Sequence, residues 1–434
     1  MTDGALERTG TFASIVQVPN YRLFFIGALV SNSGGWVARV AQDWLVLTEL
    51  TPGSATALGL VTTLQMMWLP LLSPWTGTVA DRFPKRRLLL ITQTCMTIVA
   101  GTLAWLVLSG HVRLWHVYVL AAAQGIVMAF EGPARMSFAS ELVPPRLLMN
   151  AISLNSAQFN SARLVGPAVG GLLIAAWGVG VGLLVNAVSF AAVIIALLLM
   201  RSDQIQAAPP RRGKGALREA VGYVKSRPDL LVAMAIVSMM ATFAMTFQVT
   251  TALMATTVFN KGATEFGLLG SVLGVGSLAG ALLSARRSSP RMTVLLVGLA
   301  GTSVSLVLMA AARDFWLFTV VLLPAGLCAL TVLTTTNTIV QLNTDPSMRG
   351  RVMALYMAVN QGSMPLGALF AGYVSEAIGV RWVLGIGALM TALTFVVAAT
   401  YLVRLAGGWD VVRRRYDPRL RLHFRRRRPP AEEE

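Results

Sequence analysis

The chain has 434 residues, of which 55% are hydrophobic and only 13% are charged, and its mean hydropathy is +0.66. This composition is too apolar for one or two soluble domains and indicates an integral membrane protein. The formal net charge of +17 would also suit a nucleic-acid-binding protein. The cations, however, lie where a membrane topology requires them.

Twelve long apolar runs follow one another along the chain, each long enough to cross the ~30 Å hydrocarbon core as an α-helix. The runs are continuous and do not alternate between apolar and polar residues, which disfavours a β-barrel. The first twenty residues lack the layout of a cleavable signal, so we expect the first span to remain as an uncleaved anchor. The twelve expected spans are 21–48, 56–80, 88–110, 114–140, 148–176, 180–200, 230–259, 264–285, 291–312, 315–341, 350–376 and 380–404.

The positions of lysine and arginine predict the orientation, because cytoplasmic loops collect these residues. With the N-terminus inside, and with cations at the span ends counted in the adjoining segments, 29 of the 36 cations fall in cytoplasmic segments, four in external loops and three well within spans. Both termini are therefore expected in the cytoplasm, and nucleic acid is not an expected partner. The basic tail at 406–434 would lie close to anionic lipid headgroups.

An internal repeat relates the two halves of the chain. Gly166 and Gly171 recur 201 residues later as Gly367 and Gly372. The repeat predicts an all-α membrane protein with twelve transmembrane helices in two six-helix bundles that move against each other about a central site. We expect a first bundle at 1–200, a cytoplasmic linker at 201–229, a second bundle at 230–405 and the tail. The linker stretch ALREAVGYVK predicts a short amphipathic helix.

Charge is concentrated between spans 2 and 3, in GTVADRFPKRR at 77–87. The cations alone are explained as topology determinants. The segment also resembles the loop signature of the major facilitator superfamily, G-x-L-A-D-R-x-G-R-K. In that family the acid of this loop meets a helix of the other half and holds one access state closed, so the resemblance implies a latch at Asp81, and Gly77 is expected where helices approach closely. The expected gating loop comprises Gly77, Asp81, Arg82, Lys85 and Arg86.

Span 5 contains a second motif, ARLVGPAVGG at 162–171. Its residues Gly166, Pro167, Gly170 and Gly171 resemble the antiporter motif in the fifth helix of exporters of the same superfamily. Proline kinks the helix and the glycines make a flat face, so ordinary small-residue packing is an alternative explanation. The fuller pattern favours export over import.

The resemblance covers residues 20–405 and is strongest to the bacterial exporter branch that includes enterobactin-type siderophore exporters and macrolide and multidrug efflux proteins. One position departs from the drug:proton antiporters, which usually carry an arginine in the fourth helix where this chain has Ala121. Proton coupling through that arginine is therefore not inherited.

Five charged side chains lie well inside the spans, away from their ends, and all are in the first half: Arg39 and Asp43, Glu131 and Arg135, and Arg163. Charges in lipid are costly and are functional candidates, although each four-residue pair could instead neutralise itself on one helix face. The resemblance implies that helix 4 lines the central cavity. We therefore expect Glu131 to take up and release a proton with Arg135 as its partner, and Asp43 is the alternative. Arg163 would either pair with Glu131 or serve packing.

The second half carries no charge well inside a span, but spans 7 and 11 are rich in methionine. Methionine adapts its shape to varied apolar ligands, although filling the core is its more common role. Such a lining would suit an apolar or amphipathic substrate, including a cationic one that contacts the acid. The expected substrate-cavity residues are Phe243, Phe247, Gln248, Met357 and Asn360.

Other chemistry is not indicated. The chain has two cysteines and three histidines, which form no ligand pattern, so no metal or cofactor is expected. A P-loop is lacking, which argues against ATP hydrolysis and against an enzyme. We predict a multi-pass protein of the bacterial cytoplasmic membrane, for which a monomer suffices, that exports amphipathic small molecules by proton antiport with alternating access. The alternatives are a dedicated siderophore or lipid-like metabolite exporter, and a scaffold or sensor that moves no cargo.

Overall fold

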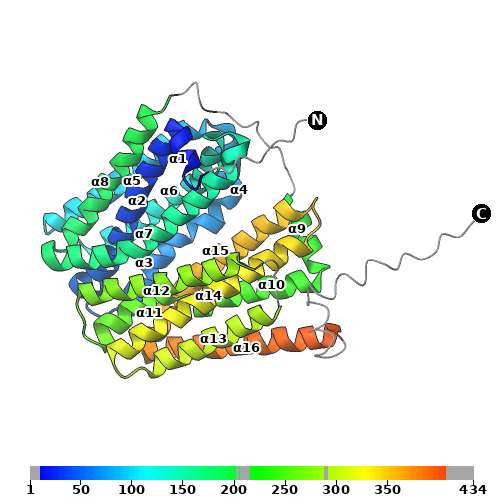
Figure 1. The fold of residues 1–434 in the computed structure, drawn as a ribbon. Helices are drawn as coiled ribbons and strands as arrows, with labels where there is room; N and C mark the ends of the chain where they lie inside the picture. The colour runs from blue at the N-terminus through cyan, green and yellow to red at the C-terminus, as the bar shows by residue number, and fades with distance from the viewer. Residues whose placement is uncertain (1–9, 202–204, 206–215, 288–291, 407–434) are drawn as a thin grey trace, which may run out of the picture.

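The computed structural model describes residues 10–201, 205, 216–287 and 292–406. The expected tail from residue 407 and much of the expected linker lie outside this part, as does the side chain of Asp81, so the latch contact is not described. The described ranges consist of helices and their connections, with no β-strand among them. The all-α expectation is confirmed (Figure 1).

The first half follows the predicted spans closely. Only the expected span 56–80 is divided, at Met67, because Pro70 cannot donate a hydrogen bond to the preceding turn. The elements are α1 (Ala13–Gln17), α2 (Pro19–Trp44) continued by the π-helical turn η1 (Leu45–Leu50), α3 (Ala55–Met66), α4 (Trp68–Arg82), α5 (Lys85–Leu108), α6 (Leu114–Glu141), the 3₁₀ turn η2 (Pro145–Leu147), α7 (Leu148–Trp177) and α8 (Val179–Leu199).

The second half begins with the predicted amphipathic helix, which forms over the whole of ALREAVGYVK as α9. The seventh span is interrupted by two π-helical turns. The elements are α9 (Ala216–Lys225), α10 (Pro228–Met239), η4 (Met240–Ala244), α11 (Phe247–Leu253), η5 (Met254–Val258), α12 (Ala263–Ala285), α13 (Met292–Ala311), α14 (Phe315–Asn343), α15 (Arg349–Ile378) and α16 (Val380–Ala406).

Eleven helical stretches of the described chain are long and apolar enough to cross a membrane. Helix α15 coincides with the expected span 350–376 but is not among them, because polar residues such as Asn360, Gln361 and Glu376 lower its hydropathy. Its 30 residues would reach ~45 Å. The twelfth span stays a prediction, and so does the cytoplasmic placement of both termini. Following that orientation, we term the helix ends near residues 110, 178 and 261 the outer ends, and the opposite ends the inner ends.

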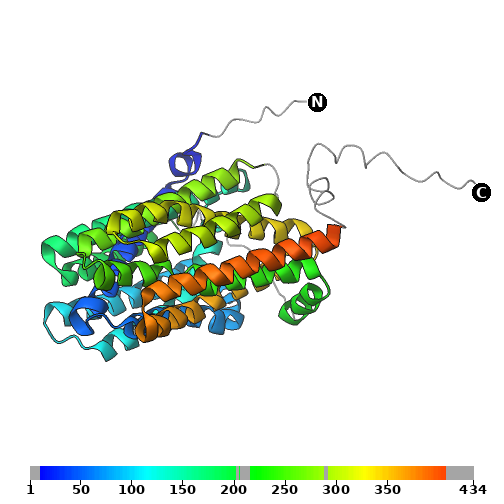
Figure 2. The same ribbon diagram turned by 90° about the horizontal axis from the view of Figure 1, so that it is seen from below.

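Each half packs its own helices together. In the first half α2 lies against α7 and α8, and α5 lies against α6 and α8; in the second, α14 lies against α12 and α13, and α13 against α16. Figure 2 shows α16, in orange-red, running along one side of the second half. The halves meet chiefly through two helix pairs, α7 with α12 and α3 with α15.

Glycines allow both of these helix pairs to approach closely, and the two interfaces repeat each other. Gly171 of α7 faces Gly267 of α12, and Gly372 of α15 faces Gly59 of α3. A side chain on either Gly171 or Gly372 would collide with the backbone of the opposite helix. Because these two glycines are equivalent in the repeat, the halves meet about a pseudo-twofold axis.

Burial at both interfaces decreases from the outer toward the inner ends. On α15, Pro365 and Ala368 are buried but Met357 is 52% exposed, and on α7, Pro167 is buried but Ser156 is exposed. Figure 1 shows the helices of the two halves close together near the labels α3 and α12 and apart toward α4 and α9. The halves are thus joined at their outer ends and accessible between their inner ends.

Polar contacts reinforce the outer junction of α3 with α15. The carboxylate of Glu376 accepts hydrogen bonds from the hydroxyl of Ser54 at 3.3 Å and from the backbone N–H of Thr56 at 3.2 Å. Further in, the hydroxyl of Thr63 donates to the carbonyl oxygen of Pro365 at 3.2 Å. The acid therefore lies at the first turn of α3, where a negative charge is favourable.

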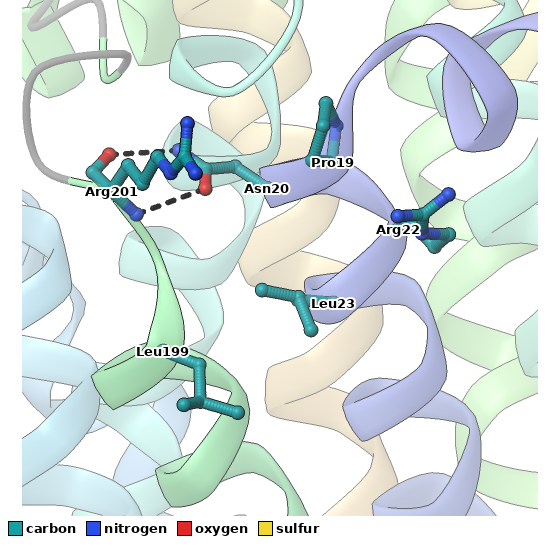
Figure 3. Close-up of a pocket in the computed structure, with 6 residues that line it drawn as sticks. All are labelled: Pro19, Asn20, Arg22, Leu23, Leu199 and Arg201. Atoms are coloured by element: carbon teal, nitrogen blue, oxygen red, sulfur yellow. Dashed lines mark hydrogen bonds between the residues drawn. The ribbon is translucent and has the colours of Figure 1, made fainter.

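The inner ends of α2 and α8 are tied together within the first half. The amide of Asn20 donates to the carbonyl oxygen of Arg201 at 2.9 Å, and the backbone N–H of Arg201 donates to Asn20 Oδ1 at 3.1 Å (Figure 3). The two arginines shown there, Arg22 and Arg201, flank a pocket of about 300 Å³ above Leu23 and Leu199. This reciprocal pair of bonds fixes the entry of the first span against the exit of the sixth.

Candidate functional site

Arg39 and Asp43 lie one turn apart on α2 and are bridged by a residue of the other half. The guanidinium of Arg39 donates to Gln248 Oε1, and Gln248 Nε2 donates to Asp43 Oδ2 at 3.3 Å. Asp43 is only 3% exposed. Arg39 also lies over the ring of Trp36, 5.4 Å from its centroid. Although the two charges share a helix face as expected, their common partner is an amide from α11, so the group belongs to the junction between the halves.

Glu131 and Arg135 form the expected pair on α6, with Arg135 Nη2 3.0 Å from Glu131 Oε1. The amide of Gln93, on α5, donates to the same carboxylate oxygen at 2.8 Å, and Arg135 donates to Asn32 Oδ1, on α2, at 3.2 Å. The cluster therefore joins three helices of the first half. The Glu131 side chain is 13% exposed, so it is more accessible than Asp43.

Arg163 stands apart from both acids. It lies on α7, one turn toward the inner end from Gly166 and Pro167, and its side chain is half-buried. Within the described part of the chain no hydrogen bond or ion pair reaches its guanidinium. Arg39 lies near enough for the two like charges to repel each other. The expected pairing of Arg163 with Glu131 is not present in this structure.

The charged turn between α4 and α5 makes its described contacts within the first half. Lys85 Nζ lies 3.6 Å from a carboxylate oxygen of Glu141, and both side chains are largely buried. Arg86 donates to the carbonyl oxygens of Leu197 and Leu198 at 2.7 and 3.2 Å, at the C-terminal end of α8. Cations at a helix C-terminus are stabilising, so these residues hold the inner ends together.

Two members of the expected gating loop lie in open surroundings. Arg82, the last residue of α4, is exposed. The expectation that Gly77 marks a close helix contact is wrong for this structure, since no described atom lies within 4 Å of where its Cβ would be. The reason is that the inner ends of the two halves are apart, so that among the described residues no helix of the second half comes near this position.

The GPxxGG motif positions α7 between two other helices. A Cβ on Gly170 would lie 3.1 Å from Val37 of α2, and Gly166 faces Trp36 of the same helix. On the neighbouring face, Pro167 contacts Gly270 and Gly171 contacts the start of α12. The small residues therefore serve close packing, both within the first half and across the junction, and whether they also select for export stays a prediction.

The expected substrate-cavity residues of the second half lie in different environments. Phe247 is buried in the core, and Phe243 is half-buried against Phe370, with ring centroids 5.1 Å apart. Met357 is exposed on the inner half of α15, and Asn360 is partly exposed one turn further out. Met357 and Asn360 therefore lie where the halves separate, whereas Phe247 packs the protein interior in this conformation.

Several polar residues of these clusters were not expected from the sequence. Gln93 and Asn32 complete the Glu131 cluster, Glu141 pairs with Lys85, and Glu376 joins the outer ends. A usable signal was the presence of isolated amides inside apolar runs, since such groups need a partner in lipid. Glu141 carried another signal, because it is an acid at the end of a span on the same expected side of the membrane as the basic turn at 82–87.

Neither metal nor disulfide chemistry is indicated by the described residues. Their His, Cys, Asp and Glu side chains form no group of three that could hold a metal ion. Cys95 and Cys328 are free and partly buried.

The chain is similar to known transporters in both sequence and fold. The profile of the transmembrane secretion effector family, a group of major facilitator transporters, matches residues 9–431. The chain is 23% identical to the staphyloferrin A transporter of Staphylococcus aureus and 27% identical to the multidrug efflux pump Tap of Mycolicibacterium fortuitum, and each alignment covers 83% of this chain and 90% of the relative. The crystal structure of a bacterial homologue of the human lysosomal transporter Spinster, inward-facing and unoccupied, shares the fold, with a TM-score of 0.71, 14% identity and coverage of 88% of this chain and 98% of that one.

Proposed function

The chain belongs to the transmembrane secretion effector family of major facilitator transporters, multi-pass proteins of the cytoplasmic membrane, and we propose that it exports amphipathic small molecules in exchange for protons. The observation that carries the proposal is the buried Asp43–Gln248–Arg39 bridge at a junction that closes only the outer ends. An exchanger needs charged groups whose surroundings change when the halves rock, and this bridge would break when the outer ends part.

Glu131 is the acid that would carry the proton. Its side chain is 13% exposed and lies in the inner half of α6, so a proton on it would leave toward the cytoplasm in this conformation. Loss of the proton restores its bond with Arg135, and gain of a proton would release Arg135 to another partner. The Glu131 side chain would therefore alternate between an ionised form paired with Arg135 and a protonated, unpaired form within one transport cycle.

Asp43 would serve as the link between charge and gating. It is sealed in this conformation, because Gln248 of the other half covers it. When the outer ends separate, Gln248 leaves with the second half and the carboxylate becomes accessible from outside. Asp43 is thus part of the outer barrier and Glu131 lies on its inner side, which suits Asp43 to the outer gate and Glu131 to proton release.

Everted membrane vesicles test the proposal. Their lumen corresponds to the cell exterior, so an acidic lumen should drive uptake of an exported compound. Ethidium and the acidic dye dansylglycine serve as probes of opposite charge. We expect uptake that requires the protein and the pH gradient and that a protonophore abolishes.

Matched neutral variants assign the acids. Glu131→Gln should abolish gradient-driven uptake while leaving downhill exchange of the dye intact, because the proton site is lost but the halves still rock. Asp43→Asn should instead reduce both processes, because it changes the outer gate. Gradient-driven uptake that persists in Glu131→Gln would move the proton site to Asp43, and no gradient-driven uptake of either dye by the wild-type protein would contradict the proposal.

A dedicated metabolite exporter is the second candidate, and one observation favours it. The similarity to the staphyloferrin A transporter covers most of both chains. A protein of this kind would transport neither general dye in the vesicle assay, and it would export a siderophore or a related metabolite from intact cells.

A further inference from the structure

The unpartnered guanidinium of Arg163 is the feature that the proposed function does not use. A cation inside a membrane-spanning segment is costly unless an anion or a set of acceptors compensates it. In the described residues Arg163 has neither, and its nearest charged neighbour named above is another cation, Arg39. A ligand that carries an anion would offset the cost of this unpaired cation when it binds.

Helical geometry directs Arg163 toward the space between the halves. Residues three and four positions further along α7, Gly166 and Pro167, face α2 and α12. By contrast Val165, Val169 and Leu172 lie on other sides of the helix and are exposed. Arg163 therefore lies on the junction face of its helix. Further toward the inner end the same face becomes accessible, as the exposed Ser156 shows.

The two acids inside the spans of the first half already have other partners, so they do not pair with Arg163. Glu131 accepts bonds from Arg135 and Gln93, and Asp43 accepts from Gln248. The three arginines and two acids well inside the spans of the first half leave an excess of one positive charge there. A cationic substrate would add to that excess, whereas an anionic one would cancel it.

Aromatic side chains lie beside the arginines. Trp36 stacks with Arg39, and its ring lies edge-on to that of Phe159, with centroids 6.3 Å apart. Phe159 is 49% exposed and lies one turn from Arg163 on the inner side. An aromatic or apolar body therefore has a surface to pack on within reach of the guanidinium.

We propose that Arg163 binds a carboxylate of the transported molecule, so that the preferred substrates are acidic amphiphiles with an aromatic or apolar body. The planar guanidinium can hold a carboxylate through two parallel hydrogen bonds, which a lysine cannot reproduce. The proposal rests on the proposed export function and narrows its substrate class. It replaces the cationic cargo that the sequence alone allowed.

Three probes with one fluorophore and different charge test the proposal by equilibrium binding to the purified full-length protein. They are dansylglycine, which is anionic, its neutral methyl ester, and the cationic dansylcadaverine. No pH gradient is applied, so the readout does not depend on proton coupling. We expect the wild-type protein to bind the acid about tenfold more tightly than the ester, and the cation most weakly.

Variants then test whether the preference for the acid over the ester depends on Arg163. Arg163→Gln should bind acid and ester equally, and Arg163→Lys should retain only part of the preference. Arg146→Gln, which removes an exposed cation from the inner side, should behave as wild type. Binding of the ester by Arg163→Gln, at wild-type strength, shows that this variant is folded.

Equal binding of acid and ester by the wild-type protein, absence of acid binding, or a preference that survives in Arg163→Gln would each overturn the proposal. Such a result would leave the export function standing if the vesicles still show gradient-driven uptake. Conversely, a charge preference lost in Arg163→Gln without any gradient-driven uptake would contradict proton exchange but not the role of Arg163.

Discussion

The glycine contact between α7 and α12 offers a sharp test of how the halves are joined. Gly171 has no room for a side chain, because a Cβ would collide with the backbone of α12. Gly171→Val therefore has to push the outer ends apart. Overpacking of this kind costs about 1–3 kcal/mol. If that cost falls only on the outward-closed state, the ratio of outward-open to closed molecules rises roughly five- to 150-fold.

A cysteine on the other interface reports this change. Thr63 is 6% exposed and lies where α3 meets α15, which is not the interface that contains Gly171. Gly171→Val therefore makes Thr63→Cys accessible only if the two interfaces open together. Cys95 and Cys328 are first replaced by serine. The rate of labelling by a membrane-impermeant maleimide added from outside should rise about five- to 150-fold in Gly171→Val, because the rate follows the open population.

Gly101→Val is the matched control. Gly101 lies in α5 with no described atom within 4 Å of its Cβ position, so the same added side chain meets open space. By the pseudo-twofold relation, Gly372→Val should act like Gly171→Val. Equal labelling rates in Gly171→Val and Gly101→Val would refute the conclusion that this contact holds the outer ends closed.

Three further predictions concern stability. Asn20→Ala removes both hydrogen bonds that tie α2 to α8 and should cost about 1–3 kcal/mol, seen as a lower thermal midpoint in detergent; an unchanged midpoint would contradict the tie. Lys85→Met should lower the free energy of unfolding by about 2 kcal/mol or more, since it leaves the buried carboxylate of Glu141 without this cation, and adding Glu141→Gln should restore part of the loss. An equal loss in Lys85→Met and in the double variant would argue against the pair. The ion pair of Glu219 with Arg351, 2.7 Å long but exposed, should show a coupling of only about 0.5 kcal/mol in a double-mutant cycle and lose it in high salt; a larger, salt-insensitive value would show that α9 is held by this pair.

Much of the architecture was predictable from the sequence because it depends on local properties. The length of each apolar run fixes a span, and Gly178 and Gly379, both with positive φ, end α7 and α15 where the repeat places equivalent residues. The amphipathic pattern of ALREAVGYVK likewise predicted α9. Helix α15 shows the limit of this approach, since a helix that faces the interior carries polar residues and loses the hydropathy of a span.

The site was less predictable because its contacts join distant parts of the chain. Four-residue spacing placed Arg39 with Asp43 but gave no sign that Gln248, more than 200 positions away, bridges them. Spacing also did not show that Arg163 lacks a partner, because pairing across helices depends on how the helices rotate. The expectation of a close helix contact at Gly77 was wrong because the inner end of the first half lies apart from the inner end of the second half in this structure.

The most direct test of the central claim measures substrate and proton movement in the same vesicles. Inside-out proteoliposomes with a trapped pH dye and a clamped membrane potential receive dansylglycine at equal pH on both sides. We predict that with the wild-type protein the lumen becomes alkaline as the dye enters, because protons leave in exchange, and that with Glu131→Gln the lumen does not become alkaline although the dye can still exchange. Passive entry of this weak acid would acidify the lumen, and protein-free liposomes measure that contribution. Accumulation of the dye without alkalinisation, or alkalinisation that persists in Glu131→Gln, would contradict proton exchange through this acid.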